Sequence, residues 1–156
     1  MKKYTVFIFL ILLFTTCEAF GQLAVGYGTD GNTLSLSTDP QHVLCGEFRV
    51  NTKAYNQSDW SHSDRGITQA YLLVRIFSST NVSLYTGAGL GVNLLTEGSE
   101  KWVSANVPVG LRINPFEKLP DLFIVGEYTP MIIIEEDVPI IHTVSLGFRY
   151  RLSKGE

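Results

Sequence analysis

The stretch LYTGAGLGVNL, residues 84–94, decides the fold expected of this sequence. Its glycines, Gly87, Gly89 and Gly91, are spaced almost like the start of a dinucleotide-binding loop. Such a loop requires a third glycine at a different position and a helix behind it, whose N-terminal amides meet the pyrophosphate. Neither feature is present, and an alternation with a period of two runs straight through the glycines. We therefore expect them to lie on one face of a β-strand.

The rest of the chain after residue 22 also consists of short alternating runs separated by turn-rich stretches, without convincing helical periodicity. An even number of antiparallel strands with tight turns on one side is typical of an up-and-down barrel. The sequence therefore predicts one all-β domain, residues 22–156, folded as an antiparallel up-and-down β-barrel. Eight strands are expected, at residues 22–28, 33–37, 43–52, 67–77, 81–93, 102–114, 121–131 and 141–152.

The N-terminus, residues 1–21, has the organisation of a secretory signal peptide. Two lysines precede an apolar run at residues 6–14, and a small-x-small cleavage site follows at residues 19–21. The apolar run is too short to span a bilayer. Two alternatives remain open, namely a retained N-terminal anchor and cleavage before Cys17 to give a lipoprotein.

Charge and cysteine content restrict the function. Removal of residues 1–21 takes away two lysines and one glutamate, so the net charge moves from −3 to −4. A mildly acidic protein is a poor nucleic-acid binder by bulk charge. The mature part keeps a single cysteine, Cys45, which excludes an internal disulfide framework. Stability is therefore expected to come from burial or from a membrane.

Each of the strands predicted at 81–93, 102–114 and 141–152 separates an apolar face from a polar face. In the second, Val107, Val109 and Leu111 alternate with Gly110 and Arg112. A soluble lipocalin-like barrel turns the apolar face inward, whereas a membrane barrel turns it outward. The alternation alone leaves both orientations open.

The identity of the charged residues favours the membrane orientation. All lysines lie in the predicted signal peptide or in turn and end regions, at Lys2, Lys3, Lys53, Lys101, Lys118 and Lys154. Strand interiors carry arginine and glutamate instead, and a confined lumen favours arginine because its planar guanidinium holds carboxylates through two hydrogen bonds. We expect two glutamates to be shared among five arginines in a lumenal charge network of Glu47, Arg49, Arg75, Arg112, Glu127, Arg149 and Arg151.

Other residues on these strands fit a narrow membrane barrel. Pro108 lies in mid-strand and cannot donate a ladder hydrogen bond, so a β-bulge is expected there. Glycines on the polar face would leave room for long arginine and glutamate side chains, at Gly87, Gly89, Gly91, Gly110 and Gly147. Aromatic residues near the strand ends suit a membrane interface, at Trp102, Tyr128, Phe148 and Tyr150.

Three segments and the signal ending at 19–21 carry a resemblance to a known family. The segments are TGAGLGV at 86–92, VPVGLRI at 107–113 and TVSLGFRYRL at 143–152. With them the chain resembles the small, eight-stranded outer-membrane β-barrel proteins of Gram-negative bacteria. The resemblance implies an outer-membrane location, contact with outer-membrane lipid and lipopolysaccharide, and insertion by the barrel assembly machinery. In that family the final strand commonly ends in an aromatic residue that the machinery recognises, whereas residues 153–156 follow Leu152 here.

Catalytic and cofactor signals are missing from the sequence. His42, His62 and His142 have no metal-ligand spacing, so we expect no metal or other cofactor. Some eight-stranded outer-membrane barrels are lipid A-modifying hydrolases that use a His/Ser pair. The nearest pair here, His142 and Ser145, is three residues apart and points to opposite faces of a strand. We therefore expect no catalytic residues.

The loops are the expected place for contact with an external partner, which the sequence does not identify. The best candidate is the loop at 53–66, with Tyr55, Trp60 and His62. The acidic residues 135–137 could bind divalent cations, although a solvated loop is the simpler interpretation. The sequence thus favours a non-catalytic outer-membrane barrel with a structural or surface-interaction role. A soluble barrel for a small apolar ligand and a lipid A-modifying enzyme remain alternatives.

Overall fold

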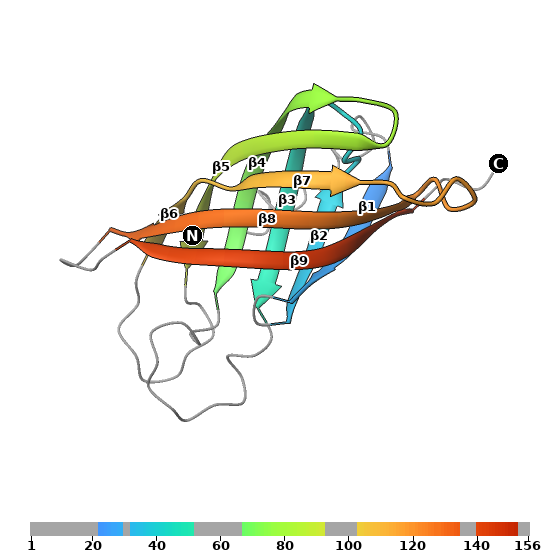
Figure 1. Ribbon diagram of the computed structural model, residues 1–156. Helices are drawn as coiled ribbons and strands as arrows, with labels where there is room; N and C mark the ends of the chain where they lie inside the picture. The colour runs from blue at the N-terminus through green and yellow to red at the C-terminus, as the bar shows by residue number, and fades with distance from the viewer. Residues whose placement is uncertain (1–21, 30–31, 52–66, 93–102, 135–139, 153–156) are drawn as a thin grey trace, which may run out of the picture.

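The computed structural model describes residues 22–29, 32–51, 67–92, 103–134 and 140–152. In this part of the chain every strand belongs to one antiparallel sheet (Figure 1). The strands are β1 (Leu23–Gly28), β2 (Thr33–Thr38), β3 (Leu44–Asn51), β4 (Thr68–Ser78), β5 (Val82–Val92), β6 (Val103–Asn106), β7 (Val109–Ile113), β8 (Leu122–Ile133) and β9 (Ile141–Leu152). None of the described residues forms a helix long and apolar enough to span a membrane.

The sheet closes on itself. Apart from β6 and β7, which do not pair with each other, each strand pairs with its neighbour in sequence, and β1 also pairs with β9. Both β6 and β7 pair with β5 on one side and β8 on the other, so they are two halves of one staggered wall strand. The predicted fold, an all-β, antiparallel up-and-down barrel of eight strands, is therefore confirmed.

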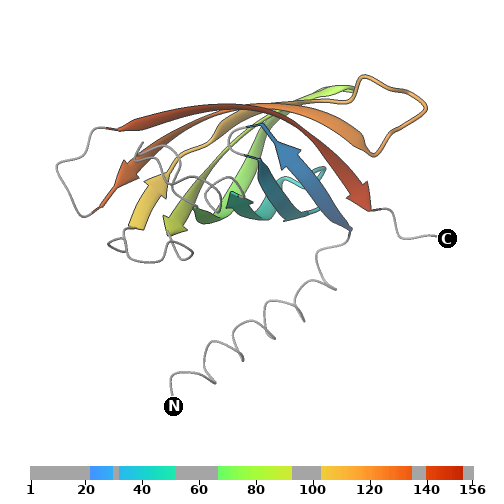
Figure 2. The same ribbon diagram turned by 90° about the horizontal axis from the view of Figure 1, so that it is seen from below.

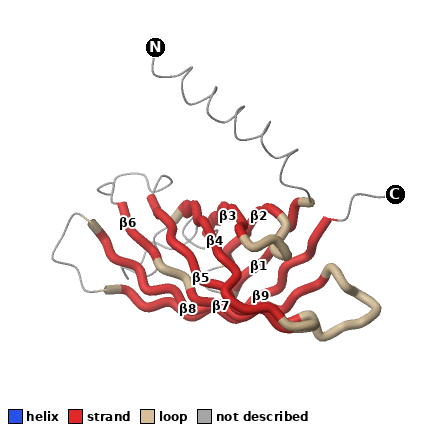
Figure 3. Tube along the Cα trace, turned by 90° about the horizontal axis from the view of Figure 1, so that it is seen from above, coloured by secondary structure: helices blue, strands red, loops and turns tan. Residues whose placement is uncertain are grey.

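Tilted strands form opposite walls of this barrel. In Figure 1 the front strands β7, β8 and β9 cross the back strands β1, β2 and β3 at a steep angle, as strands of a closed barrel do. Figure 2 shows the long β8 and β9 arching over β1 and β2, and Figure 3 shows β2, β3 and β4 opposite β7, β8 and β9. Side chains that point inward from opposite walls can therefore meet across the lumen.

The connections between strands gather at two ends. The connections at residues 39–43, 79–81 and 114–121 lie at the end where Leu23 pairs with Leu152, and we name it the turn end. The opposite end carries the connections at 29–32, 52–67, 93–102 and 134–140, and we name it the loop end. This division follows from antiparallel pairing, because successive connections must alternate between the two ends.

The junction between β6 and β7 shows that the predicted bulge at Pro108 is wrong. The pairing with β5 and β8 keeps one register on both sides of the gap, so no extra residue is inserted. The Pro108 carbonyl still accepts a hydrogen bond from the Gly87 amide at 3.1 Å, and the Val107 amide donates to Pro130 at 3.2 Å. Pro108 has no N–H to donate in return, so the ladder is interrupted without a change of register.

The barrel has apolar residues outside and charged residues inside. The exposed fractions of Val107, Val109 and Leu111 are 49%, 43% and 38%, whereas those of Arg112 and Arg149 are 2% and 4%. The same outward apolar face continues around the wall, with exposed side chains at Leu36, Phe48, Leu72, Leu90, Ile124, Val144, Leu146 and Phe148. The side-chain orientation expected of a membrane barrel is the one that the structure has.

The lumen is less polar than the sequence suggested. One apolar cluster includes Cys45, Leu73 and Phe123 in the turn-end half, and a second includes Ile67 and Met131 near the loop end. The charged residues lie between them, as the buried inward series on β8 shows: Phe123, Val125, Glu127, Thr129, Met131 and Ile133. The apolar clusters thus enclose the charges and remove them from bulk water.

Candidate functional site

The buried charges come from opposite walls of the barrel. Glu47 and Arg49 alternate with Phe48 on β3 and therefore both point inward, while Glu127 and Arg149 point inward from β8 and β9. Each of these four charged residues is at most 6% exposed. Because β3 and β8 are diametrically opposite in the strand order, a contact between them spans the lumen.

A continuous chain of ion pairs joins these walls. The Arg49 guanidinium donates through Nη1 and Nη2 to the two carboxylate oxygens of Glu127, the second bond measuring 2.7 Å. Its Nε donates to Oε1 of Glu47 at 2.9 Å, and the same oxygen accepts from Nη2 of Arg149 at 2.7 Å. Arg49 therefore links both glutamates, and the network braces β3 against β8 and β9.

Hydroxyl groups complete the environment of Glu127. Tyr85 donates to Oε2 at 2.6 Å and Thr129 donates to Oε1 at 2.8 Å. Tyr71 lies beneath the Arg49 guanidinium, with 4.4 Å from Cζ of Arg49 to the ring centroid. Neither tyrosine was among the residues predicted for this network, although Tyr85 shares its face of the strand with Gly87, Gly89 and Gly91 and could have been found there.

Two of the glycines, Gly89 and Gly110, make room for these tyrosine rings rather than directly for arginine and glutamate. Tyr71 lies directly opposite Gly89 in the β4–β5 pair, and Tyr85 directly opposite Gly110 in the β5–β7 pair. A Cβ on Gly89 would approach Cε1 of Tyr71 to 2.6 Å, and a Cβ on Gly110 would overlap the Tyr85 ring. Each ring thus occupies the space left by the missing side chain on the neighbouring strand.

The remaining arginines lie toward the turn end and do not share the glutamates. Arg151 donates through Nε to Oδ1 of Asp121 at 2.6 Å, and its Nη1 lies 3.9 Å from Oδ2 of Asp39. Arg112 donates through Nη1 to the Pro40 carbonyl at 2.6 Å. Among the described residues, the Arg75 side chain has no hydrogen bond or ion pair. The expectation that five arginines share Glu47 and Glu127 is therefore wrong, because only Arg49 and Arg149 contact them.

The lumen beside the ion pairs is almost completely filled. A cavity of about 30 Å³ remains between Tyr27, Glu47, Arg49 and Glu127. A space of this size admits water beside the ion pairs, and it is far smaller than the pockets that hold drug-sized ligands.

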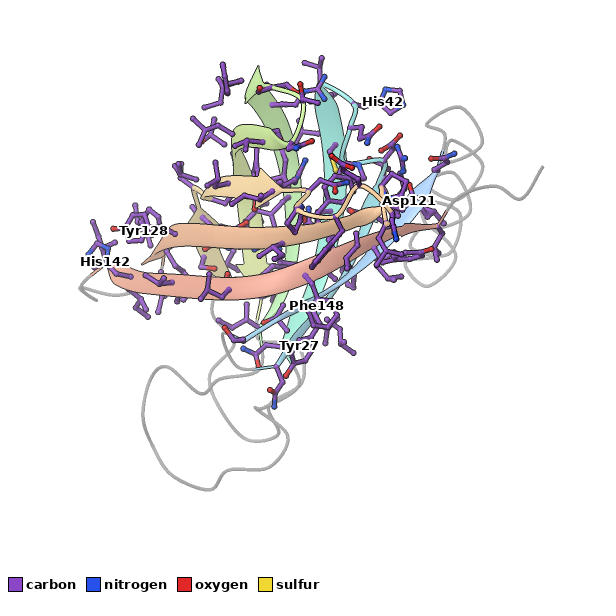
Figure 4. All side chains as sticks on the ribbon, turned by 45° about the vertical axis from the view of Figure 1, so that its right-hand side comes forward. Tyr27, His42, Asp121, Tyr128, His142 and Phe148 are labelled. Atoms are coloured by element: carbon purple, nitrogen blue, oxygen red, sulfur yellow. The ribbon has the colours of Figure 1, made fainter. Side chains whose placement is uncertain are left out.

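On the outer surface, His142 forms a pair with Tyr128 rather than with Ser145. Nδ1 of His142 lies 2.6 Å from the Tyr128 hydroxyl, and the two rings are stacked with centroids 5.9 Å apart (Figure 4). Ser145 belongs to the inward face of β9, where it lines the cavity. The described residues contain no group of three or more His, Cys, Asp or Glu side chains that could hold a metal ion.

Several predicted functional residues cannot be placed. Tyr55, Trp60 and His62 of the candidate contact loop lie outside the described residues, as do Trp102 and the acidic residues 135–137. Tyr128, Phe148 and Tyr150 are described, and each is exposed on the outer wall.

The chain is similar in fold to solved structures of other proteins. No family profile and no curated protein sequence matches the chain. Among solved structures, the N-terminal β-barrel domain of Pseudomonas aeruginosa OprF is similar with a TM-score of 0.57 at 12% identity, over 84% of this chain and 96% of that one. The Yersinia pestis outer membrane protein Ail matches with a TM-score of 0.45 at 19% identity, over 85% of this chain and 99% of that one.

The similarity to OprF is one of fold, since the sequence identity is low. It agrees with the closed eight-stranded barrel derived from the strand pairing. The resemblance of the sequence to small outer-membrane β-barrels of Gram-negative bacteria is therefore confirmed at the level of the fold.

Proposed function

We propose that this chain is an integral outer-membrane β-barrel with a structural or surface-interaction role and no catalytic activity. The observation that carries the proposal is the inverted side-chain distribution, with exposed valine, leucine, isoleucine and phenylalanine around the wall and a buried Arg/Glu network inside. A soluble monomer rarely exposes so extensive an apolar surface. Hydrocarbon would cover this surface in a bilayer. The closed strand pairing would leave no strand edge with unpaired backbone N–H and C=O groups there.

The two ends of the barrel would then face different compartments. Small outer-membrane barrels have short periplasmic turns and longer extracellular loops. The turn end would face the periplasm, and the loop end would face outward with the 53–66 loop and its Tyr55, Trp60 and His62. The proposed contacts are outer-membrane lipid and lipopolysaccharide around the wall, the barrel assembly machinery during insertion, and an external partner at the loops.

A role as a general diffusion pore is not supported. The ion pairs from Arg49 to Glu127 and from Arg149 to Glu47 cross the lumen, and the space beside them measures only about 30 Å³. A brace of this kind favours a rigid scaffold that holds its loops in place.

The two alternatives have less support. A barrel for a small apolar ligand needs an apolar interior cavity, and the interior here contains Glu47, Arg49 and Glu127. A lipid A-modifying His/Ser site needs both side chains on one face, and His142 and Ser145 lie on opposite faces of β9.

Cell fractionation tests the proposed function. We expect the mature chain to sediment with the outer membrane, to resist extraction by carbonate, and to dissolve only with detergent. Unheated samples should migrate faster than boiled samples in gel electrophoresis, because a closed barrel stays compact in the detergent. Recovery of the exported chain in the soluble periplasmic fraction without detergent would contradict the proposal and favour the soluble alternative.

A further inference from the structure

A second, larger pocket opens at the turn end of the barrel. Its volume is about 250 Å³, and it lies between the connections at 39–43 and 79–81 and the adjoining ends of β4, β5 and β7. Two arginines, Arg75 and Arg112, are the charged side chains that line it, and no acidic residue does. Hydroxyl groups supply much of the remaining polar lining, from Ser78, Ser79, Thr80 and Ser83.

Arg112 is held rigidly in this pocket wall. Its side chain is buried, its Nη1 donates to the Pro40 carbonyl at 2.6 Å, and its Cζ lies 4.1 Å from the centroid of the Tyr85 ring. Tyr85 is itself fixed by its hydrogen bond to Glu127. The guanidinium is therefore positioned before any ligand arrives, which lowers the entropic cost of binding.

The free edge of Arg112 has the geometry that an oxyanion requires. Its Nε and Nη2 are buried and have no hydrogen-bond partner among the described residues. These two nitrogens share one side of the guanidinium, the side that can donate two parallel hydrogen bonds to a carboxylate or a phosphate. A buried charged donor without an acceptor is costly, so an anion that accepts from this edge would be strongly favoured.

The charge balance of the lumen also calls for an anion. Glu47 and Glu127 already accept from Arg49 and Arg149, and Arg151 is matched by Asp121. Arg112 is therefore the buried guanidinium in the described barrel that lacks a carboxylate. Arg75 adds a second positive charge to the same pocket without an internal partner.

From these observations we infer that the turn-end pocket is a binding site for a single oxyanion of the phosphate class. Arg112 donates two hydrogen bonds from its Nε and Nη2 edge, and Arg75 supplies the second charge. The hydroxyl groups of Ser78, Ser79 and Thr80 complete the shell around the anion. The ligand is either a free phosphate ion or the phosphate of a lipid headgroup, and both share this chemistry. The inference goes beyond the proposed function and does not depend on the compartment that the turn end faces.

Calorimetric titration of the folded barrel tests this site. The mature chain, residues 22–156, is refolded in a non-ionic detergent without phosphate or sulfate and titrated with sodium phosphate, and in parallel with glycerol 1-phosphate and sodium acetate. We expect saturable binding of one phosphate per barrel. Tighter binding of glycerol 1-phosphate would assign the site to a lipid headgroup, and tighter binding of inorganic phosphate would assign it to the free ion.

Variants distinguish this pocket from general surface charge. Arg112→Met should weaken phosphate binding by about 10-fold or more, which corresponds to the loss of a charge-assisted pair of hydrogen bonds. Arg75→Gln should also weaken it and, since Arg75 has no internal partner, should fold normally as judged by heat-modifiable gel mobility. Arg151→Gln is the matched control, because Arg151 lies at the same end but does not line the pocket.

The inference is overturned if the native barrel shows no saturable binding of either phosphate ligand. It is also overturned if folded Arg75→Gln binds phosphate as tightly as the native chain, or if Arg151→Gln weakens binding as much as Arg75→Gln does. Failure of the site would leave the proposed membrane location intact, since fractionation does not depend on this pocket.

Discussion

Replacement Glu127→Ala should lower the free energy of unfolding of the barrel by about 3–5 kcal/mol, because it breaks a buried ion pair by removing one partner. The Glu127 carboxylate accepts two hydrogen bonds from Arg49 and one each from Tyr85 and Thr129. Without it, the charge on Arg49 keeps only Glu47 as a carboxylate partner. Urea unfolding of the refolded barrel in detergent, followed by tryptophan fluorescence or gel mobility, measures the change.

Two further variants show whether this effect belongs to the network. Glu117→Ala removes the same charge from the exposed connection at 114–121 and should leave stability nearly unchanged. Arg49→Met combined with Glu127→Ala should cost less than the sum of the two single changes, since both remove the same bonds. An unfolding free energy of Glu127→Ala equal to that of Glu117→Ala would contradict the cross-lumen brace.

Replacement Gly110→Ala should destabilise the barrel by about 1–3 kcal/mol, because it overpacks a filled interior. The new Cβ would overlap the ring and hydroxyl of Tyr85. That ring has no exposed surface, and its hydroxyl is bonded to Glu127 while Arg112 stacks on its face. The ring cannot move aside without disturbing both charges. The same unfolding titration measures the effect.

Gly46→Ala is the control for this substitution. Gly46 lies in β3, and a Cβ there would meet no atom within 4 Å. Its stability should be unchanged or slightly higher, because alanine restricts the unfolded chain. Equal stability of the two variants would show that the contact between Tyr85 and Gly110 is not a tight one.

Sequence alternation predicted the walls of this barrel well, for a physical reason. A strand places successive side chains on opposite faces, so Val109 and Leu111 must lie on one side if Gly110 and Arg112 lie on the other. The types of charged residue in the strands then indicated which of the two faces points into the lumen. Arginine and glutamate without lysine indicated a confined lumen, and the structure places Arg112 and Arg149 inside.

The partners within the lumen could not be predicted in the same way. Glu127 was expected to be shared among five arginines, one of which, Arg112, lies on the neighbouring strand, yet its partner is Arg49 on the opposite wall. A contact across a barrel depends on strand tilt and stagger, and a single strand's pattern contains neither. The contact between Tyr85 and Gly110 was easier to predict, because the register of the β5–β7 pair alone places them opposite each other.

The apolar part of the lumen was missed because of β8. Its inward series mixes Phe123, Val125 and Met131 with Glu127, and the outward series is also largely apolar. Such a strand has no clear polar face, so its alternation gives no orientation. The bulge expected at Pro108 was wrong because loss of an amide proton was equated with an inserted residue, and the unchanged register shows that the two are separate.

Spin-label accessibility of the outer wall tests the central claim, the contact of this wall with hydrocarbon, most directly. Single cysteines replace Val109, Leu111 and Leu146 in a Cys45→Ser background, and the labelled barrel is reconstituted into phospholipid bilayers. We predict that relaxation of all three labels is enhanced by oxygen, which concentrates in hydrocarbon, and hardly affected by a water-soluble nickel chelate. Strong relaxation by the nickel chelate with little effect of oxygen would place this wall in water and contradict the account.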